Sequence, residues 1–329
     1  MPKISVIIPV YNVREYLAMC LDSVCWQSLK DIEIICVNDG STDKSLAVLH
    51  AFARRDKRIR IIDKENAGSG VARNEGLKIA AGEYVFFLDG DDWLEKDALE
   101  KMYNAAAKDD LDILIFGGSS CRVKGSRFKK SHGGYTYKKL PQKYKNKIFS
   151  ANDIKKDIFK FPATIWTKLY KREFLINNNI KFQEIKIGQD QLPFFHSMIV
   201  GERIGLLHKN LYCYRKNRSG SAMTVKKKKN FSPIYVFYGI ENLLNDLGKT
   251  EEYQDIFINK YFSKATSWLG KFNDETKKEY FEEYQKLLNH IKEKYPHGWW
   301  VYFEPKINDY YQMLKLKQFL AKKFKFMLK

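Results

Sequence analysis

Residues 1–116 alternate between short apolar runs and longer amphipathic stretches, and this alternation restricts the fold more than any other feature. A short continuous apolar run is typical of a strand buried in a parallel sheet. Such strands, joined through helices by short connections, predict a doubly wound, mostly parallel α/β sheet. The expected strands are Ile4–Val10, Ile32–Asn38, Ile59–Ile62, Tyr84–Leu88 and Leu111–Phe116, and the expected helices are Val13–Gln27, Lys44–Arg54, Gly68–Ala80 and Leu94–Ala107.

The fourth expected strand ends in three carboxylates, Asp89, Asp91 and Asp92. Ligands of open α/β sheets bind beyond the carboxyl ends of the strands. Three crowded carboxylates repel one another unless a cation or a basic ligand neutralises them. Oxygen ligands without nearby His or Cys suit Mg2+ or Mn2+. Taken alone, the stretch is equally consistent with a solvated turn that caps a helix starting near Leu94, since Asp is a good N-cap residue.

Polar residues also follow the first and second expected strands. Pro9, Tyr11 and Asn12 mark the end of the first, and Asp39 marks the end of the second. The carboxyl ends of parallel strands share one edge of a sheet, so these side chains and the three carboxylates are expected to converge. Asp39 can accept hydrogen bonds from a base or a ribose, or it can cap the next helix.

Gly68-Ser69-Gly70 opens the third expected helix, and Arg73 lies on its first turn. The stretch lacks the third glycine of a dinucleotide-binding motif, so it is weak evidence for one. Free N–H groups at a helix N-terminus nevertheless favour phosphate, and an arginine there can pair with a diphosphate. The alternative for Arg73 is an exposed helical side chain.

Four stretches, in this order and spacing, resemble the family 2 glycosyltransferases with the GT-A fold. The resemblance covers residues 1–117 closely and extends less closely to about 224, through 165–170, 189–194 and 212–215. We therefore expect a catalytic domain in residues 1–224 and a basic helical region in 225–329. The four stretches are Val6–Asn12, Val37–Asp43, Gly70–Gly76 and Phe87–Trp93.

The resemblance implies transfer of one sugar, with inversion, from a nucleotide diphosphate donor to an acceptor hydroxyl. It implies that Asp91 binds Mn2+ or Mg2+ directly, with Asp89 and Asp92 as further candidate ligands. Family frequency favours a UDP-sugar donor, and a glycan or lipid-linked acceptor of surface polysaccharide synthesis is expected. The donor-binding residues it implies are Pro9, Tyr11, Asn12, Asp39, Asn66, Arg73, Asp89, Trp166, Lys168 and Arg215.

Inversion needs a general base near the acceptor hydroxyl. The family usually supplies it from a Glu-Asp pair at the start of an apolar helix, and the corresponding residues here are Gln189 and Asp190. The resemblance therefore assigns the base to Asp190 alone. Two alternatives remain at this point: Asp190 only caps the helix, or the chain is an inert homologue that binds sugar nucleotides.

Charge is distributed unevenly along the chain. Residues 1–120 contain 15 Lys and Arg against 20 Asp and Glu, so the net charge of +19 comes from the remainder. Such a basic region favours nucleic acid, an anionic membrane or a phosphorylated substrate. The motifs lie in the acidic half and no nucleic-acid-binding module is present, so a polyanion-binding protein is the weaker hypothesis.

The C-terminal stretch 310–329 carries apolar residues at helical spacing beside many lysines. This pattern is typical of an amphipathic helix drawn to anionic lipid, although a helix packed on the domain has the same pattern. The first expected strand begins at Ile4 without a signal-peptide pattern, and the five cysteines form no CxxC pair. We therefore expect a cytoplasmic protein, peripheral on the inner face of the cytoplasmic membrane.

Overall fold

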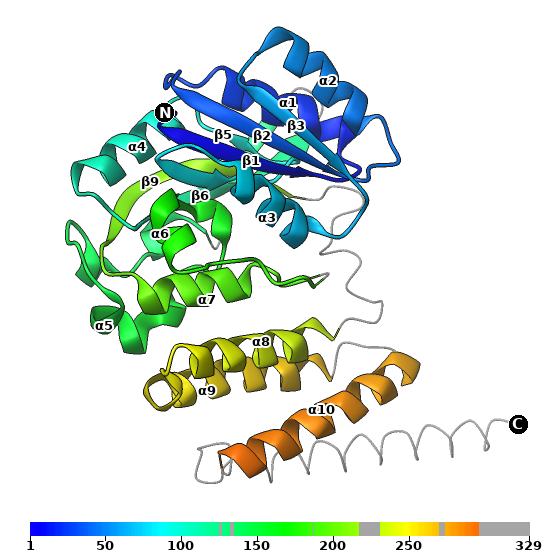
Figure 1. The fold of residues 1–329 in the computed structure, drawn as a ribbon, viewed down its shortest axis with the longest axis vertical. Helices are drawn as coiled ribbons and strands as arrows, with labels where there is room; N and C mark the ends of the chain where they lie inside the picture. The colour runs from blue at the N-terminus through cyan, green and yellow to red at the C-terminus, as the bar shows by residue number, and fades with distance from the viewer. Residues whose placement is uncertain (125–126, 132–134, 186, 217–230, 270–273, 296–329) are drawn as a thin grey trace, which may run out of the picture. The chain divides into compact units, whose positions relative to one another are not determined.

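A mixed nine-stranded sheet forms the centre of the N-terminal part of the chain in a computed structural model (Figure 1). The structure describes residues 1–329 except 125–126, 132–134, 186, 217–230, 270–273 and 296–329. The strand order is β3-β2-β1-β4-β8-β6-β9-β5, and β7 pairs with β6. The strands are β1 (Ile4–Val10), β2 (Ile32–Asp39), β3 (Ile59–Lys64), β4 (Tyr84–Phe87), β5 (Trp93–Leu94), β6 (Ile113–Lys124), β7 (Arg127–Ser131), β8 (Lys168–Lys171) and β9 (Ile204–Arg215).

Helices follow or separate these strands. Helices α1, α2 and α3 connect the parallel strands β1 to β4, as the alternation in the sequence predicts. The α-helices are α1 (Arg14–Cys25), α2 (Ser45–Arg55), α3 (Ser69–Ile79), α4 (Ala98–Lys108), α5 (Ala151–Ile154), α6 (Arg172–Asn177), α7 (Gln191–Val200), α8 (Ser232–Asp246), α9 (Thr250–Trp268) and α10 (Asp274–Lys294).

Strand β1 lies at the centre of the parallel half of the sheet. Its Ile7 pairs with Ile35 of β2 on one side and with Phe87 of β4 on the other, and all three side chains are buried. Helix α3 approaches β1 closely, because a Cβ added at Gly76 would lie 2.5 Å from Ile7 Cγ2. The prediction of a GT-A-like α/β sheet followed by a helical C-terminal region is confirmed. The predicted parallel pairing holds for β1 to β4, whereas β5, β7 and β8 pair antiparallel with their neighbours.

The sheet contains one strand that the sequence did not predict, and one local prediction is wrong. Strand β8 runs antiparallel between β4 and β6, where its Leu169 pairs with Phe86 and Leu114. No helix begins at Leu94, because Trp93 and Leu94 form β5 and pair with β9. Helix α4 starts later, at Ala98. The side chains of Trp93 and Leu94 are buried where β5 pairs with β9. The helix therefore begins only after the chain has left the sheet.

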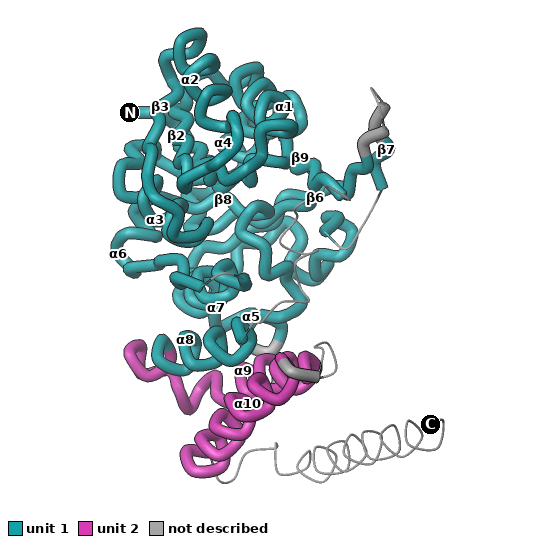
Figure 2. The backbone as a smooth tube through the Cα atoms, turned by 90° about the vertical axis from the view of Figure 1, so that its right-hand side faces the viewer, with its two compact units in different colours: residues 1–243 teal, residues 244–329 magenta. Residues whose placement is uncertain are grey.

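The chain divides into two compact units, residues 1–243 and 244–329 (Figure 2). The predicted boundary near 225 falls outside the described residues. In the second unit, α9 and α10 pack through aromatic side chains: Tyr284 OH lies 2.9 Å from Thr266 Oγ1, and Tyr280 OH donates to Ala265 O at 2.8 Å. The stretch 310–329 also lies outside the described residues.

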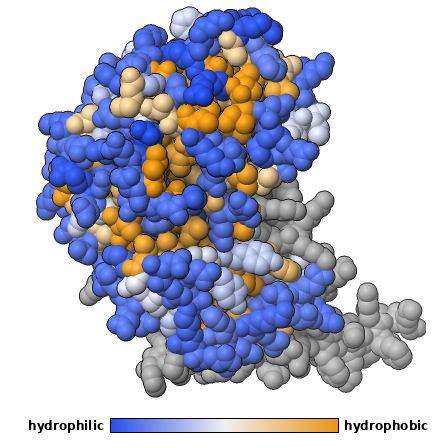
Figure 3. All heavy atoms as spheres, viewed as in Figure 1, coloured by the Kyte–Doolittle hydropathy of each residue, from blue (hydrophilic) through white to orange (hydrophobic). Residues whose placement is uncertain are grey.

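Polar side chains cover most of one face of the molecule, with apolar side chains visible between them over the strands (Figure 3). In the part of the chain that the structure describes, every helix is too short or too polar to span a bilayer.

Candidate active site

The loops that follow β1 and β2 are joined by Asn12. This residue has a left-handed backbone, with φ of 50°, which asparagine tolerates better than most residues. Its Oδ1 accepts a hydrogen bond from Thr42 N at 2.8 Å, and its Nδ2 donates to Thr42 Oγ1 at 3.2 Å. Pro9 is buried in β1, whereas Tyr11 is 49% exposed. Asn12 therefore shapes the edge, and Tyr11 is accessible to a ligand there.

Asp39 organises the loop between β3 and α3. Its Oδ1 accepts hydrogen bonds from Lys64 Nζ at 3.0 Å and Ala67 N at 2.9 Å, and its Oδ2 accepts one from Gly68 N at 2.8 Å. Asn66 Nδ2 donates to the Asp39 backbone carbonyl at 2.8 Å. The side chain is 2% exposed. These contacts give Asp39 and Asn66 a positioning role, and their direct contact with a donor stays a prediction.

Asp39 does not cap the next helix. Helix α2 begins six residues further on, at Ser45, and Lys44 precedes it. The carboxylate points instead to the loop that leads into α3.

Arg73 is buried and forms an ion pair with the partly exposed Asp89, with Nη2 and Oδ1 2.6 Å apart. The arginine is 5% exposed and its guanidinium lies over the Phe182 ring at 5.4 Å. The alternative of an exposed helical arginine is therefore wrong. Its Nε and Nη1 are buried and have no hydrogen-bond partner in the structure. Buried donors of this kind carry a free-energy cost until an acceptor binds them.

The acidic turn, Asp89–Asp92, separates the carboxylates into two environments. Asp92 is 1% exposed and accepts hydrogen bonds from Tyr212 OH at 2.6 Å and Arg215 N at 2.7 Å. Burial raises the pKa of Asp92 well above its usual value, and the charges of Asp91 and Asp89 add to the effect. Asp89 and Asp91 are partly exposed. The options of Asp92 as a helix cap or a metal ligand therefore do not fit.

Arg215 binds the backbone of the acidic turn. Its Nε donates to the Asp91 carbonyl at 2.7 Å, and its guanidinium lies 4.9 Å from the Tyr16 ring centroid and 4.8 Å from that of Trp93. The residue is 8% exposed at the end of β9. These contacts differ from the expected donor contact and give Arg215 the role of holding the backbone that carries Asp91.

The acidic turn fits a divalent cation only if a ligand completes the coordination. No group of three His, Cys, Asp or Glu side chains in the described residues is arranged to hold a metal ion. Mg2+ is usually held by one or two carboxylates together with water and substrate phosphates, rather than by an all-protein cage. Asp91, with Asp89 beside it, supplies hard oxygen donors of that kind.

Asp190 lies immediately before α7 and its side chain makes no capping hydrogen bond to the helix, so the cap alternative is wrong. The preceding residue joins this segment to α3: Gln189 Nε2 donates to Ser69 Oγ at 2.5 Å. The approach is close, because a Cβ added at Gly70 would lie 3.2 Å from Gln189 Cβ. The segment that carries Asp190 therefore packs on the N-terminus of α3.

Lys168 and Trp166 are buried, in contrast to their expected donor contacts. Lys168 is 0% exposed and its Nζ donates to Pro162 O at 2.6 Å and Thr164 O at 2.7 Å. Burial lowers the pKa of Lys168 to about 7, and the negative charge of Asp190 partly opposes that shift. Trp166 is 6% exposed and stacks on Tyr212, with ring centroids 4.4 Å apart. Lys168 therefore binds backbone carbonyls and Trp166 packs on Tyr212, and both contacts lie within the protein interior.

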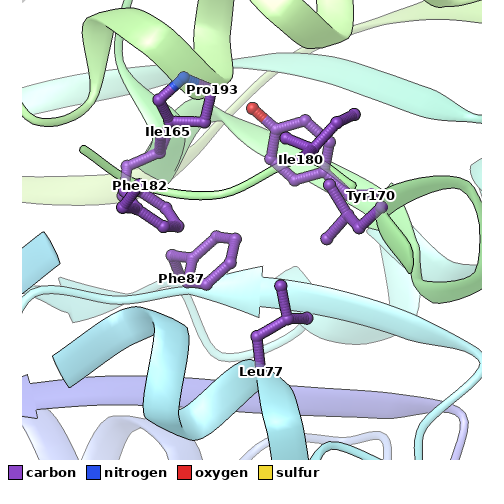
Figure 4. A pocket seen from close by; sticks show the side chains of 8 residues that line it. Leu77, Phe87, Ile165, Tyr170, Ile180, Phe182 and Pro193 are labelled. Atoms are coloured by element: carbon purple, nitrogen blue, oxygen red, sulfur yellow. The ribbon is translucent and has the colours of Figure 1, made fainter. Parts of the chain in front are cut away.

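A small apolar pocket lies beneath this site, between α3, β4, β8 and α7 (Figure 4). Its lining includes Leu77, Phe87 and Pro193 and offers no charged group. A nucleotide diphosphate needs donors and cations, so this pocket does not suit one.

Several residues of the site were not among the site residues that the sequence analysis proposed. Thr42 binds Asn12, Lys64 binds Asp39, and Ser69 binds Gln189. Lys64 ends β3 and Ser69 begins α3. These positions, where a strand ends and a helix begins, are the signal that could have found them. Tyr212 lies within a strand, where the sequence pattern suggests only core packing. Its hydrogen bond to Asp92 depends on the pairing of β9 with β5.

The edge formed by β1, β2, β3 and β4 thus gathers an exposed aromatic side chain, an arginine at a helix N-terminus and an acidic turn. This arrangement defines an α/β protein with a polar site at the carboxyl ends of its strands.

The chain matches the model of the family "Glycosyl transferase family 2" over residues 5–175. It is 32% identical over 298 residues to glycosyltransferase GlyA of Streptococcus pneumoniae serotype 4, covering 88% of this chain and 42% of GlyA. It is 31% identical over 273 residues to the uncharacterized glycosyltransferase EpsJ of Bacillus subtilis, covering 79% of this chain and 76% of EpsJ. The chain thus spans less than half of the length of GlyA but about three quarters of EpsJ.

A solved structure of S. aureus TarS 1–349 in complex with UDP-GlcNAc has a TM-score of 0.67 to this chain at 25% identity, and the match covers 85% of this chain and 79% of that one. The chain belongs to glycosyltransferase family 2.

Proposed function

We propose that the protein transfers one sugar, with inversion, from a UDP-sugar to a hydroxyl of a glycan or lipid-linked acceptor. The observation that carries the proposal is the convergence of Tyr11, Arg73 and the acidic turn at one sheet edge, with Asp190 held against the same α3 N-terminus. The solved TarS structure with UDP-GlcNAc supports a nucleotide-sugar donor for this fold.

On this proposal, the donor nucleoside lies beside Tyr11 and the loop that Asp39 orders. The diphosphate lies toward α3, the helix that carries Arg73. A guanidinium pairs well with phosphate oxygens, and a helix N-terminus adds N–H groups toward the same charge.

A divalent ion, Mn2+ or Mg2+, would be held by Asp91 with Asp89 as its neighbour. Bound there, it would neutralise the departing diphosphate as a Lewis acid. Arg215 holds the Asp91 backbone through a 2.7 Å hydrogen bond and Tyr212 keeps Asp92 turned inward, so only part of the acidic turn faces a ligand.

Asp190 would accept the proton of the attacking acceptor hydroxyl. A base must lie within hydrogen-bond reach of that hydroxyl. The place of Asp190 at the N-terminal end of α7, directly after the Gln189 that binds Ser69 of α3, supports this role.

A second candidate function is that of a homologue that binds sugar nucleotides without turnover. It is considered because Gln189 stands where the family usually has a glutamate. Its amide is used to bind Ser69 rather than Asp190, which leaves the proposed base in place. We therefore favour the active enzyme.

A panel of nucleotide sugars, tested by thermal shift with and without Mn2+, identifies the donor, because a ligand that binds the folded state raises its apparent stability. Transfer or donor hydrolysis is then compared between wild type and Asp190→Asn. The proposal predicts a metal-dependent shift for a UDP-sugar and loss of turnover in the variant. Wild-type turnover in Asp190→Asn would remove the assigned base, and binding without any turnover in wild type would favour the inert homologue.

A further inference from the structure

Four aromatic rings gather between the acidic turn and Asp190. Trp166 lies between Tyr212 and Tyr214, with ring centroids 4.4 and 5.7 Å away and interplanar angles of 22° and 1°. Tyr135 lies edge-on to Trp166 at 4.7 Å. Trp166 and Tyr212 are buried, whereas Tyr135 and Tyr214 are half-buried. The cluster therefore has an inner layer that packs and an outer layer of two tyrosines that a ligand can reach.

The outer layer is held in place by its backbone and its neighbours. Gly118 N donates to Tyr135 O at 2.8 Å, and Asn210 Oδ1 accepts a bond from Tyr137 N at 2.9 Å. Gly118 also permits the close approach of the tryptophan, because a Cβ there would lie 2.9 Å from the Trp166 ring. A ring pair fixed in this way binds a ligand with little loss of side-chain freedom.

The two tyrosines lie within electrostatic reach of the groups that would react. Burial raises the pKa of Tyr135, and the negative charges of Asp190 and Asp92 raise it further. Burial also raises the pKa of Tyr214 to about 12, with contributions from Asp92, Tyr135 and Asp91. Tyr135 therefore lies near both the proposed base and the acidic turn.

The sheet order separates these tyrosines from the nucleotide side of the site. Tyr11 follows β1 and Asp39 ends β2, whereas Tyr214 lies on β9 and Tyr135 bonds to β6. In the sheet, β4 with its acidic turn stands between these two groups of strands. A donor on the β1–β2 side would leave the β6–β9 side for the acceptor.

We propose that Tyr135 and Tyr214 form a subsite for a pyranose ring of the acceptor. This inference rests on the proposed glycosyl transfer. A pyranose has an apolar C–H face and a rim of hydroxyls, so it matches a side chain with an aromatic face and a polar O–H. The subsite would present an acceptor hydroxyl between Asp190 and the acidic turn.

Saturation-transfer NMR on the full chain with saturating UDP and Mg2+, which is diamagnetic, tests the subsite. The probe is methyl β-D-glucopyranoside, and mannitol, which has hydroxyls but no ring face, is the comparison. We expect transfer to the pyranoside C–H protons only. Tyr214→Ala should weaken pyranoside binding about three- to tenfold, Tyr214→Phe should retain it, and Tyr135→Phe should weaken it through loss of the hydroxyl.

Tyr235→Ala is the matched control, since Tyr235 is 46% exposed on α8 and lies outside the cluster; it should leave the signal unchanged. A UDP thermal shift is recorded for every variant. Variants that retain the UDP thermal shift are folded and bind the nucleotide. Among these, an undiminished pyranoside signal in both Tyr214→Ala and Tyr135→Phe overturns the subsite. An equal saturation-transfer signal for mannitol and the pyranoside in wild type also overturns it. If wild type itself shows no UDP shift, the proposed function fails and the subsite fails with it. Should Tyr214→Ala not fold, Tyr135→Phe decides the result.

Discussion

Gln189 Nε2 donates a 2.5 Å hydrogen bond to Ser69 Oγ, 120 residues away in the sequence. This contact joins the segment of the proposed base to the N-terminus of α3, the helix that carries Arg73. The two sides of the proposed reaction are therefore linked by one side-chain bond.

Removing this bond should slow transfer and leave UDP binding nearly unchanged. Ser69→Ala deletes the acceptor while keeping the helix, and the loss of one neutral hydrogen bond corresponds to a kcat about three- to tenfold lower. The measurement is kcat together with the Kd of UDP. Gln189→Glu is the control, because its carboxylate can accept a bond from the Ser69 hydroxyl. If Ser69→Ala keeps wild-type kcat, the contact does not position Asp190.

Asp39→Asn should lower stability and weaken UDP binding together. In the variant, the side-chain NH2 group replaces one of the two carboxylate oxygens. That group would face either Lys64 and Ala67 or Gly68, which are themselves donors, so they would lose their acceptor. We expect a loss of about 1–3 kcal/mol in the free energy of unfolding. Urea unfolding and UDP titration provide the measurements. Asp31→Asn, at an exposed position before β2, is the matched control and should change neither. Unchanged stability in Asp39→Asn would contradict the role given to this carboxylate.

Lys168 makes a pH-dependent contribution to stability. Its pKa is lowered to about 7 by burial, whereas an unfolded lysine has a pKa of about 10.4. Between pH 7 and about pH 10.4, Lys168 is protonated in the unfolded chain but neutral in the folded one. The free energy of unfolding of wild type therefore rises with pH through this window. Below pH 7 the destabilisation caused by burying this lysine is present in full.

The test compares wild type with Lys168→Met by urea unfolding at pH 7.0 and pH 9.5. The difference in unfolding free energy should move in favour of wild type by about 3 kcal/mol at the higher pH. Lys171→Met is the control on the same strand. Lys171 is paired with Asp110, and its pKa is raised, so it stays protonated in both states over this range. A difference for Lys168→Met that does not change with pH would contradict a lowered pKa.

The parallel half of the sheet was predictable from the sequence because each strand of residues 1–88 is a short apolar run followed by a polar turn. The insertion of β8 was not predictable in the same way. Its four residues, Lys168–Lys171, include two lysines, and their place depends on pairing with Phe86 and Leu114 far away in the chain. Leu94 was assigned to a helix for the same reason, since only its pairing with β9 makes it part of a strand.

The strand ends that carry the candidate site were likewise predictable, but the contacts of each side chain were not. Asp39, Asp92 and Arg215 were all expected at ligands or helix ends, and each instead binds protein groups. A sequence motif shows that a polar residue is required at a position. Whether that residue touches a ligand or holds another residue depends on burial and on partners that are distant in the sequence, such as Tyr212 for Asp92.

The central claim is that Asp91 holds a divalent ion on a bound nucleotide diphosphate while Asp190 serves the acceptor. Calorimetric titration of UDP, with and without Mn2+, tests it most directly in wild type, Asp91→Ala and Asp190→Asn. We predict that Mn2+ strengthens UDP binding in wild type and in Asp190→Asn and that Asp91→Ala loses this strengthening. Equal UDP affinity with and without Mn2+ in wild type, or an unchanged effect of Mn2+ in Asp91→Ala, would contradict the account.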